Sequence, residues 1–232
     1  MSSWYPFGGV GPYGTYGNLG LYGALVVYGS INLTETSPAQ IFAEPLSVKE
    51  IRDYLRLPDL TSDDEDDSLL MMIVAAREQA EILQNRDLVQ KQWDLHHDYW
   101  PSYRIEMRTP LISTDLVQYT DSDGNDTAMV EDVDYIVDAS KGPGILAPPY
   151  NGTWPTFTPW PSSSILIRFT SGYAATHPWW SGPGARVKIG MKLLISHWYS
   201  NRLPFEKGAT DSTEYPYTVT SCLSYGALVR AR

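Results

Sequence analysis

Two neighbouring stretches decide the fold: Ser164-Ile165-Leu166-Ile167-Arg168-Phe169, and ARVKIGMKLLISHWYSNR at residues 185–202. The first alternates apolar and polar residues, which predicts a β-strand. The second carries a broad apolar face at helical spacing and only basic charges, which predicts a long helix over residues 184–202. We expect this face to pack the cores of the subunits; it consists of Val187, Met191, Leu194, Ile195 and Trp198.

Three more helices are predicted on either side of these stretches. Ser47 and Glu50 have the spacing of a capping box, and apolar residues follow at helical spacing as far as Leu55. The acidic run at 63–67 precedes a second helix over about residues 67–85, because carboxylates stabilise a helix N-terminus. A final short helix is predicted over about residues 218–229.

The region between the second and third helices has the character of β-structure. Strand-like alternation occurs at residues 92–96, 104–107, 116–119 and 133–137, and 121–125 reads as a hairpin turn. We therefore predict an α+β fold in which an antiparallel β insertion interrupts a small helical domain of about four helices. The predicted domains are an N-terminal arm and linker at 1–45, a helical domain at 46–87 plus 183–232, and the β insertion at 88–182.

The first 34 residues carry no charge and have glycine at every third position from Gly8 to Gly23. Three residues is the period of a polyproline II helix. One interpretation is a flexible low-complexity tail; the other is an aromatic strap that orders against a neighbouring subunit. The residues that define the strap are Gly11, Gly14, Gly17, Tyr13, Tyr16 and Tyr22.

Charge and composition exclude several classes of protein. The net charge of −10 argues against a general nucleic-acid binder, and the single cysteine excludes a disulfide framework and a cysteine-rich zinc site. No basic residue precedes position 35 to start a signal peptide, and glycines interrupt the apolar stretch 19–33, so we expect no membrane partner. Residues 35–140 hold 24 acids and 8 bases, whereas 141–232 hold 3 acids and 9 bases. Such polarity suits a protein that stacks between partners.

No motif in the sequence indicates an enzyme, a metal site or a cofactor. A metalloprotease helix, a phosphate-binding glycine loop and a nucleophile elbow are all missing from the sequence. His96 and His97 are adjacent in a predicted strand and so point to opposite faces. The alternative to a structural role is a tail-associated carbohydrate-binding module, with stacking residues Trp154, Trp160, Trp179 and Trp180.

Five strings in series resemble the head–tail connector proteins of tailed phages and gene transfer agents, which are also called adaptor or head-completion proteins. They are LSVKEIRDYLRL at 46–57, DDEDD at 63–67 with the leucines that follow, LVQKQW at 88–93, RFTSGY at 168–173 and ISHWYSNR at 195–202. The last is the most specific. The resemblance covers residues 46–232.

This resemblance implies a structural protein of the virion neck, made in the host cytoplasm, that acts in virus assembly and DNA ejection. Family members form a homo-oligomeric ring, usually a dodecamer, that binds the portal protein and presents a platform to the tail or head-closure protein. Genomic DNA passes through without sequence recognition. The residues expected at the portal are those of the C-terminal segment: Leu223, Tyr225, Leu228, Val229, Arg230 and Arg232.

Overall fold

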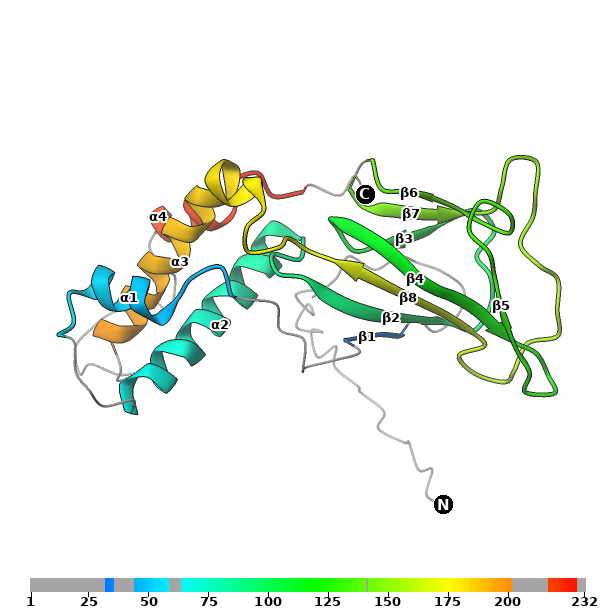
Figure 1. The fold of residues 1–232 in the computed structure, drawn as a ribbon, viewed down its shortest axis with the longest axis horizontal. Helices are drawn as coiled ribbons and strands as arrows, with labels where there is room; N and C mark the ends of the chain where they lie inside the picture. The colour runs from blue at the N-terminus through cyan, green and yellow to red at the C-terminus, as the bar shows by residue number, and fades with distance from the viewer. Residues whose placement is uncertain (1–31, 36–43, 59–63, 141, 202–216, 229–232) are drawn as a thin grey trace, which may run out of the picture.

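The computed structural model describes residues 32–35, 44–58, 64–140, 142–201 and 217–228, which form a helical half and a sheet half (Figure 1). The strands that follow α2 all precede α3 in the sequence, so the chain leaves the helical half once and returns once. The described part of the chain contains four α-helices and antiparallel sheets, which confirms the predicted α+β class. The helices are α1 (Val48–Leu55), α2 (Asp64–Gln84), the 3-10 helix η1 (Pro178–Ser181), α3 (Pro183–Ser200) and α4 (Tyr217–Leu223).

Helix α1 begins and ends as its sequence predicts. The Glu50 backbone N–H donates to the Ser47 hydroxyl at 3.2 Å, and the Ser47 N–H donates to the Glu50 carboxylate at 3.0 Å. The reciprocal pair satisfies two N–H groups that a helix start leaves without partners. Arg56 ends the helix in the left-handed conformation, with φ of 56°.

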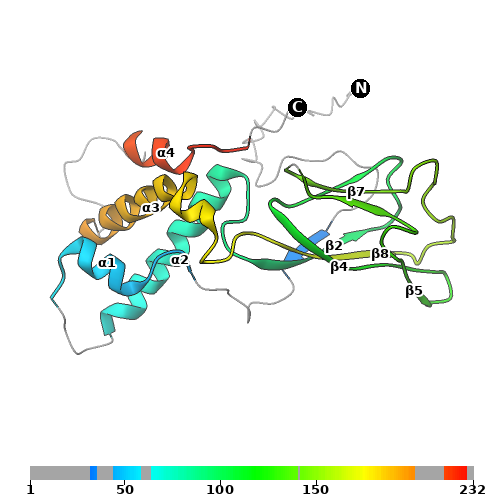
Figure 2. The ribbon, with the colours of Figure 1, turned by 45° about the horizontal axis from the view of Figure 1, so that its top comes forward.

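The helical half has one core, to which every α-helix contributes. Helix α4 packs on α3, and α3 packs on α2 (Figure 2). Burying one large aliphatic side chain contributes about 1.5–3 kcal/mol, so this core carries much of the stability of the helical half. Its fully buried apolar residues are Ile51, Leu69, Ile73, Ala76, Ala80, Leu88, Val187, Met191, Leu194, Ile195 and Leu223.

The sheet half consists of a five-stranded and a three-stranded antiparallel sheet. The larger sheet has the order β1-β2-β8-β4-β5 and the smaller one the order β3-β7-β6. The strands of the larger sheet are β1 (Asn32–Glu35), β2 (Lys91–His97), β4 (Leu111–Thr120), β5 (Asp126–Ala128) and β8 (Ile165–Ser171). Those of the smaller sheet are β3 (Ile105–Met107), β6 (Ile136–Asp138) and β7 (Gly144–Ala147).

The two sheets pack face to face around a second core. On β8, Ile165, Ile167 and Phe169 are fully buried, and the residues between them are not, as the alternating sequence predicts. The same apolar cluster contains Met107 and Leu146 from the smaller sheet. Figure 1 shows the smaller sheet lying over the larger one. The arrangement is a small β-sandwich joined to a helical bundle.

Three local predictions were wrong or incomplete. The strand expected at 133–137 starts only at Ile136, because residues 130–135 form a turn in which the Asp134 carboxylate accepts the Val130 N–H at 2.9 Å. Helix α4 ends at Leu223, and Gly226 with φ of 72° prevents its continuation. Strand β1 was not predicted: it pairs with β2 and lies within the segment expected to be an arm and linker.

The buried histidine of β2 makes the fold sensitive to acid. His97 is 2% exposed, and its Nε2 has no hydrogen-bond partner in the described residues. Burial lowers the pKa of His97 below its usual value. The charge of Asp98 raises this pKa, and His96 lowers it further. The folded state therefore favours the neutral imidazole. The free energy of unfolding should fall as the pH drops below the pKa that His97 has in the unfolded chain.

We predict that the free energy of unfolding falls between about pH 7.5 and about pH 5.5, and that His97→Leu reduces this fall. Urea unfolding at the two pH values measures the difference. The matched control is His177→Asn, which changes an exposed histidine and should leave the fall unchanged. An identical pH dependence in wild type and His97→Leu would contradict the assignment.

Candidate functional site

No group of three or more His, Cys, Asp or Glu side chains among the described residues is placed to hold a metal ion. No helix in the described ranges has both the length and the apolar character needed to cross a membrane. At the hairpin turn, the Asp121 carboxylate accepts the backbone N–H groups of Asp123 and Asn125, both at 2.9 Å, and hydrogen bonds from Asn125 are the main cause that lowers the pKa of Asp121. This carboxylate therefore serves the turn.

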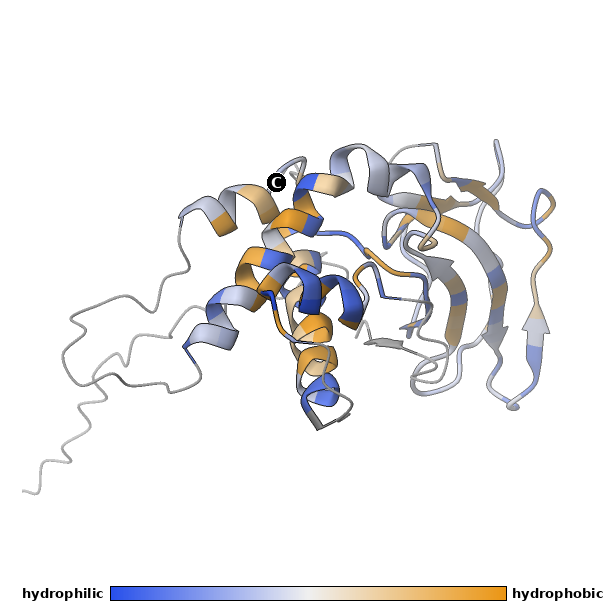
Figure 3. Ribbon diagram, turned by 60° about the vertical axis from the view of Figure 1, so that its left-hand side comes forward, coloured by the Kyte–Doolittle hydropathy of each residue, from blue (hydrophilic) through white to orange (hydrophobic). Residues whose placement is uncertain are grey.

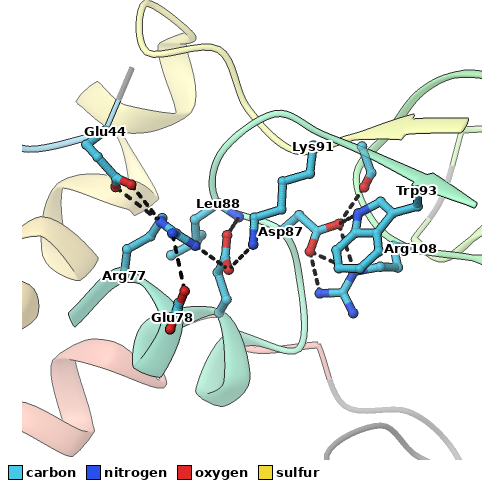
Figure 4. A network of polar contacts seen from close by, with 10 residues as sticks. Glu44, Arg77, Glu78, Asp87, Leu88, Lys91, Trp93 and Arg108 are labelled. Carbon is cyan, nitrogen blue, oxygen red and sulfur yellow. Dashed lines mark hydrogen bonds and ion pairs between the residues drawn. The ribbon is translucent and has the colours of Figure 1, made fainter. Parts of the chain in front are cut away.

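The most elaborate polar structure in the described chain is the joint between the two halves (Figure 4). Glu81, near the end of α2, accepts from the Arg77 guanidinium, the Leu88 backbone N–H and the Lys91 ammonium, each at 2.9 Å. Glu81 and Arg77 are only 6% and 3% exposed. One carboxylate thus ties α2 to the first residue of β2.

A second carboxylate completes this joint from the sheet side. Asp87 is fully buried between α2 and β2, and it accepts from Trp93 Nε1 at 3.0 Å and from Arg108 Nε at 2.7 Å. The Ser171 hydroxyl, at the end of β8, also donates to it. One donor comes from β2, one from the loop before β4 and one from the end of β8. Asp87 therefore holds these three parts of the sheet half against the end of α2.

Further contacts make this joint tight. Arg77 also donates to Glu44 at 3.1 Å; burial raises the pKa of Glu44, and the Arg77 charge opposes that rise. The Arg108 guanidinium lies 4.6 Å from the centre of a Trp93 ring. Gly172 has φ of 107°, and a Cβ there would lie 1.9 Å from the Val89 carbonyl oxygen, so only glycine fits this crossing.

The C-terminal segment lies on its own subunit beside this joint. The Gln84 side-chain amide, at the end of α2, donates to the carbonyls of Leu223 and Tyr225, and the Leu228 N–H donates to the Gln84 carbonyl at 3.1 Å. Leu223 packs so closely on Gly190 of α3 that a Cβ there would lie 2.7 Å from it. Hydrogen bonds to Gln84 therefore hold the segment on α2, and the apolar contact of Leu223 holds it on α3.

The structure places the predicted site residues in three groups. Four of the α3 residues are buried in the core of their own subunit: Val187, Met191, Leu194 and Ile195. The fifth, Trp198, is half-buried. In the C-terminal segment Leu223 is fully buried, Leu228 is half-buried and Tyr225 is 47% exposed. Val229, Arg230, Arg232 and the strap residues Gly11, Gly14, Gly17, Tyr13, Tyr16 and Tyr22 lie outside the described residues.

The four tryptophans of the carbohydrate alternative do not form one stacking platform. Trp154 is buried and stacks on Trp100 in the sheet half at 4.5 Å. Trp179 instead stacks on Tyr173 in the helical half, with Trp180 edge-on to it. Trp160 is the most exposed of the four, at 46%. Trp154 and the pair Trp179 and Trp180 therefore lie in different halves of the molecule.

The fold is similar to that of chains from gene transfer agent particles. One, from the neck of an empty particle computed with C6 symmetry, is 20% identical; the match covers 87% of this chain and 97% of that chain, with a TM-score of 0.66. A second, from the virion of the native particle, is 22% identical with coverages of 86% and 97% and a TM-score of 0.65. A third, from the neck of the native particle computed with C12 symmetry, is 20% identical with coverages of 87% and 97% and a TM-score of 0.61.

No protein-family model matches the chain, and no curated protein matches it. The three structural matches show that the chain has the fold of chains found in gene transfer agent necks. This confirms the predicted α+β fold. Membership of the connector family stays a prediction.

We predict that Asp87→Ala lowers the free energy of unfolding by roughly 3–5 kcal/mol, because it leaves Arg108 and two other donors without their buried acceptor. Chemical denaturation measures the loss. The matched control is Asp53→Ala, which removes an ion pair whose side chains are 80% and 67% exposed and should cost about 0.5 kcal/mol or less. Equal losses in the two variants would contradict the role given to the joint.

Proposed function

We propose that this chain is a structural neck protein of a phage or gene transfer agent particle. The observation that carries the proposal is the fold match, which spans nearly the whole of chains taken from particle necks. In this proposal the subunits form a homo-oligomeric ring, a dodecamer, between the portal protein of the head and the tail or head-closure protein. The proposed location is the virion neck, after synthesis in the host cytoplasm.

The architecture supports a mechanical role for the subunit. A buried joint holds the helical half and the sheet half in one orientation, so a load applied to one half reaches the other. Residues 35–140 carry most of the acids, and an acidic channel wall would repel DNA phosphates and let the genome slide through during ejection. The role needs no catalysis, and we propose none.

The proposed portal contact is the exposed part of the C-terminal segment. Tyr225 is half exposed, and the Arg186 guanidinium lies 3.9 Å from the centre of its ring. Val229, Arg230 and Arg232 follow directly in sequence and would add apolar and basic contacts. Leu223 anchors this segment from inside the subunit core. The strap at 1–31 is proposed to pack on a neighbouring subunit.

Removing the gene from the producing strain tests the proposed function. We predict filled heads and separate tails in electron micrographs, because the ring that joins them is missing, and restored particles when the gene is supplied on a plasmid. Particles with normal necks in the deleted strain would contradict a neck role.

A second experiment tests the portal contact. We predict that deleting residues 229–232 together with Tyr225→Ala weakens binding to purified portal at least about tenfold. We expect an unchanged melting temperature, because the Tyr225 side chain is 47% exposed. Tyr150→Ala is the matched control, since Tyr150 is 93% exposed in the sheet half. Wild-type portal binding by the shortened variant would overturn the assignment.

A further inference from the structure

Helix α2 is apolar on two sides, although only one of them faces the core. Residues 69–76 read LLMMIVAA, an unbroken apolar run longer than two helical turns. Figure 3 shows the ribbon of α2 hydrophobic through consecutive turns beyond its hydrophilic start. A helix at a protein surface normally carries apolar residues on one face only. The second apolar side therefore needs a partner outside the subunit.

The outward side of α2 forms a regular stripe, here called the α2 stripe: Asp67, Met71, Val74, Glu78 and Ile82. Its spacings of three and four residues keep all five side chains on one face. Met71 is 66% exposed and Ile82 is 51% exposed, whereas Ile73 and Ala80 on the opposite side are fully buried. The stripe is thus apolar, with an acid at its start and another towards its end.

Helix α3 presents a stripe with a base at its start, here called the α3 stripe: Arg186, Ile189, Leu193 and His197. Ile189 is 54% exposed, and Arg186 and His197 are also exposed, whereas Leu193 is half-buried at the edge of the helical core. The sequence of α3 contains no acidic residue. Because α2 and α3 share one core through their inward faces, the two stripes lie on opposite sides of the helical half.

The two stripes match in spacing, and each has a residue of opposite charge at its start. Eleven residues separate Asp67 from Glu78 on α2, and eleven separate Arg186 from His197 on α3. At 1.5 Å per residue each pair spans about 16.5 Å, with two apolar side chains between its polar ends. Helices packed side by side in parallel with these stripes facing would bury the apolar residues, place Asp67 opposite Arg186 and place Met71 beside Ile189.

We propose that the α2 stripe of one copy packs against the α3 stripe of the next copy. The two stripes are different surfaces on opposite sides of the same subunit, so the contact is head-to-tail and repeats from copy to copy. Such a contact closes into a ring when the rotation per copy allows it. This inference rests on the proposed function and names the subunit contact that builds the ring.

Disulfide trapping tests the contact, starting from a Cys222→Ser background because Cys222 is the single native cysteine. Full-length Met71→Cys and Ile189→Cys proteins are mixed under the conditions in which the wild type assembles, and then oxidised. We expect a cross-linked dimer from the mixture, and a ladder of larger species from the chain that carries both substitutions. The control mixes Ile189→Cys with Ile112→Cys, since Ile112 is 46% exposed on β4.

Charge reversal gives an independent readout at positions that do not affect the core. Asp67→Arg should weaken self-association at least about tenfold, and mixing it with Arg186→Glu should restore association, because the reversed charges again meet opposite partners. Sedimentation velocity measures both effects.

The outcomes separate this inference from the proposed function. If the wild type assembles into rings but the Met71–Ile189 pair cross-links no better than the control pair, the stripe contact is overturned and the neck role stands. If the wild type stays monomeric alone and with portal, both are overturned. Selective cross-linking with charge-swap rescue supports the contact.

Discussion

The buried carboxylate of Asp87 is the constraint on which the rest of the structure depends. It lies where α2 gives way to β2, and its donors come from β2, from the loop before β4 and from the end of β8. A buried carboxylate is costly unless each oxygen is paired, so the helix end, the loop before β4 and the end of β8 must meet in one geometry. Glu81, in the last turn of α2, is a second buried carboxylate that accepts hydrogen bonds from residues beyond the helix. The two carboxylates make one rigid subunit from a helical bundle and a β-sandwich.

A rigid subunit gives each surface a fixed direction. The helical half carries the two outward stripes and the C-terminal segment, and the sheet half extends away from them (Figure 1). A protein that joins two larger assemblies needs such fixed directions, because each contact surface must face its own partner. The acid-rich and base-rich parts of the chain add a polarity that favours ordered stacking.

The sequence predicted those features that local rules control. The capping box of α1, the alternation of β8 and the apolar face of α3 follow from spacing alone, and the structure has each of them. Strands β5 and β7 were not predicted, because three or four residues carry little periodicity and depend on distant partners. The roles of Asp87 and Leu223 were also missed, since only the tertiary fold buries these residues. For Glu81 a signal existed: it lies four residues after Arg77, which is the spacing of an ion pair along a helix.

The most direct test of the neck-ring account is the mass of the purified protein, alone and mixed with portal, by light scattering on a sizing column. The account predicts a complex with portal that contains a ring of about twelve copies, set by the symmetry of a closed head-to-tail contact. A small species that ignores portal under all conditions would contradict the account.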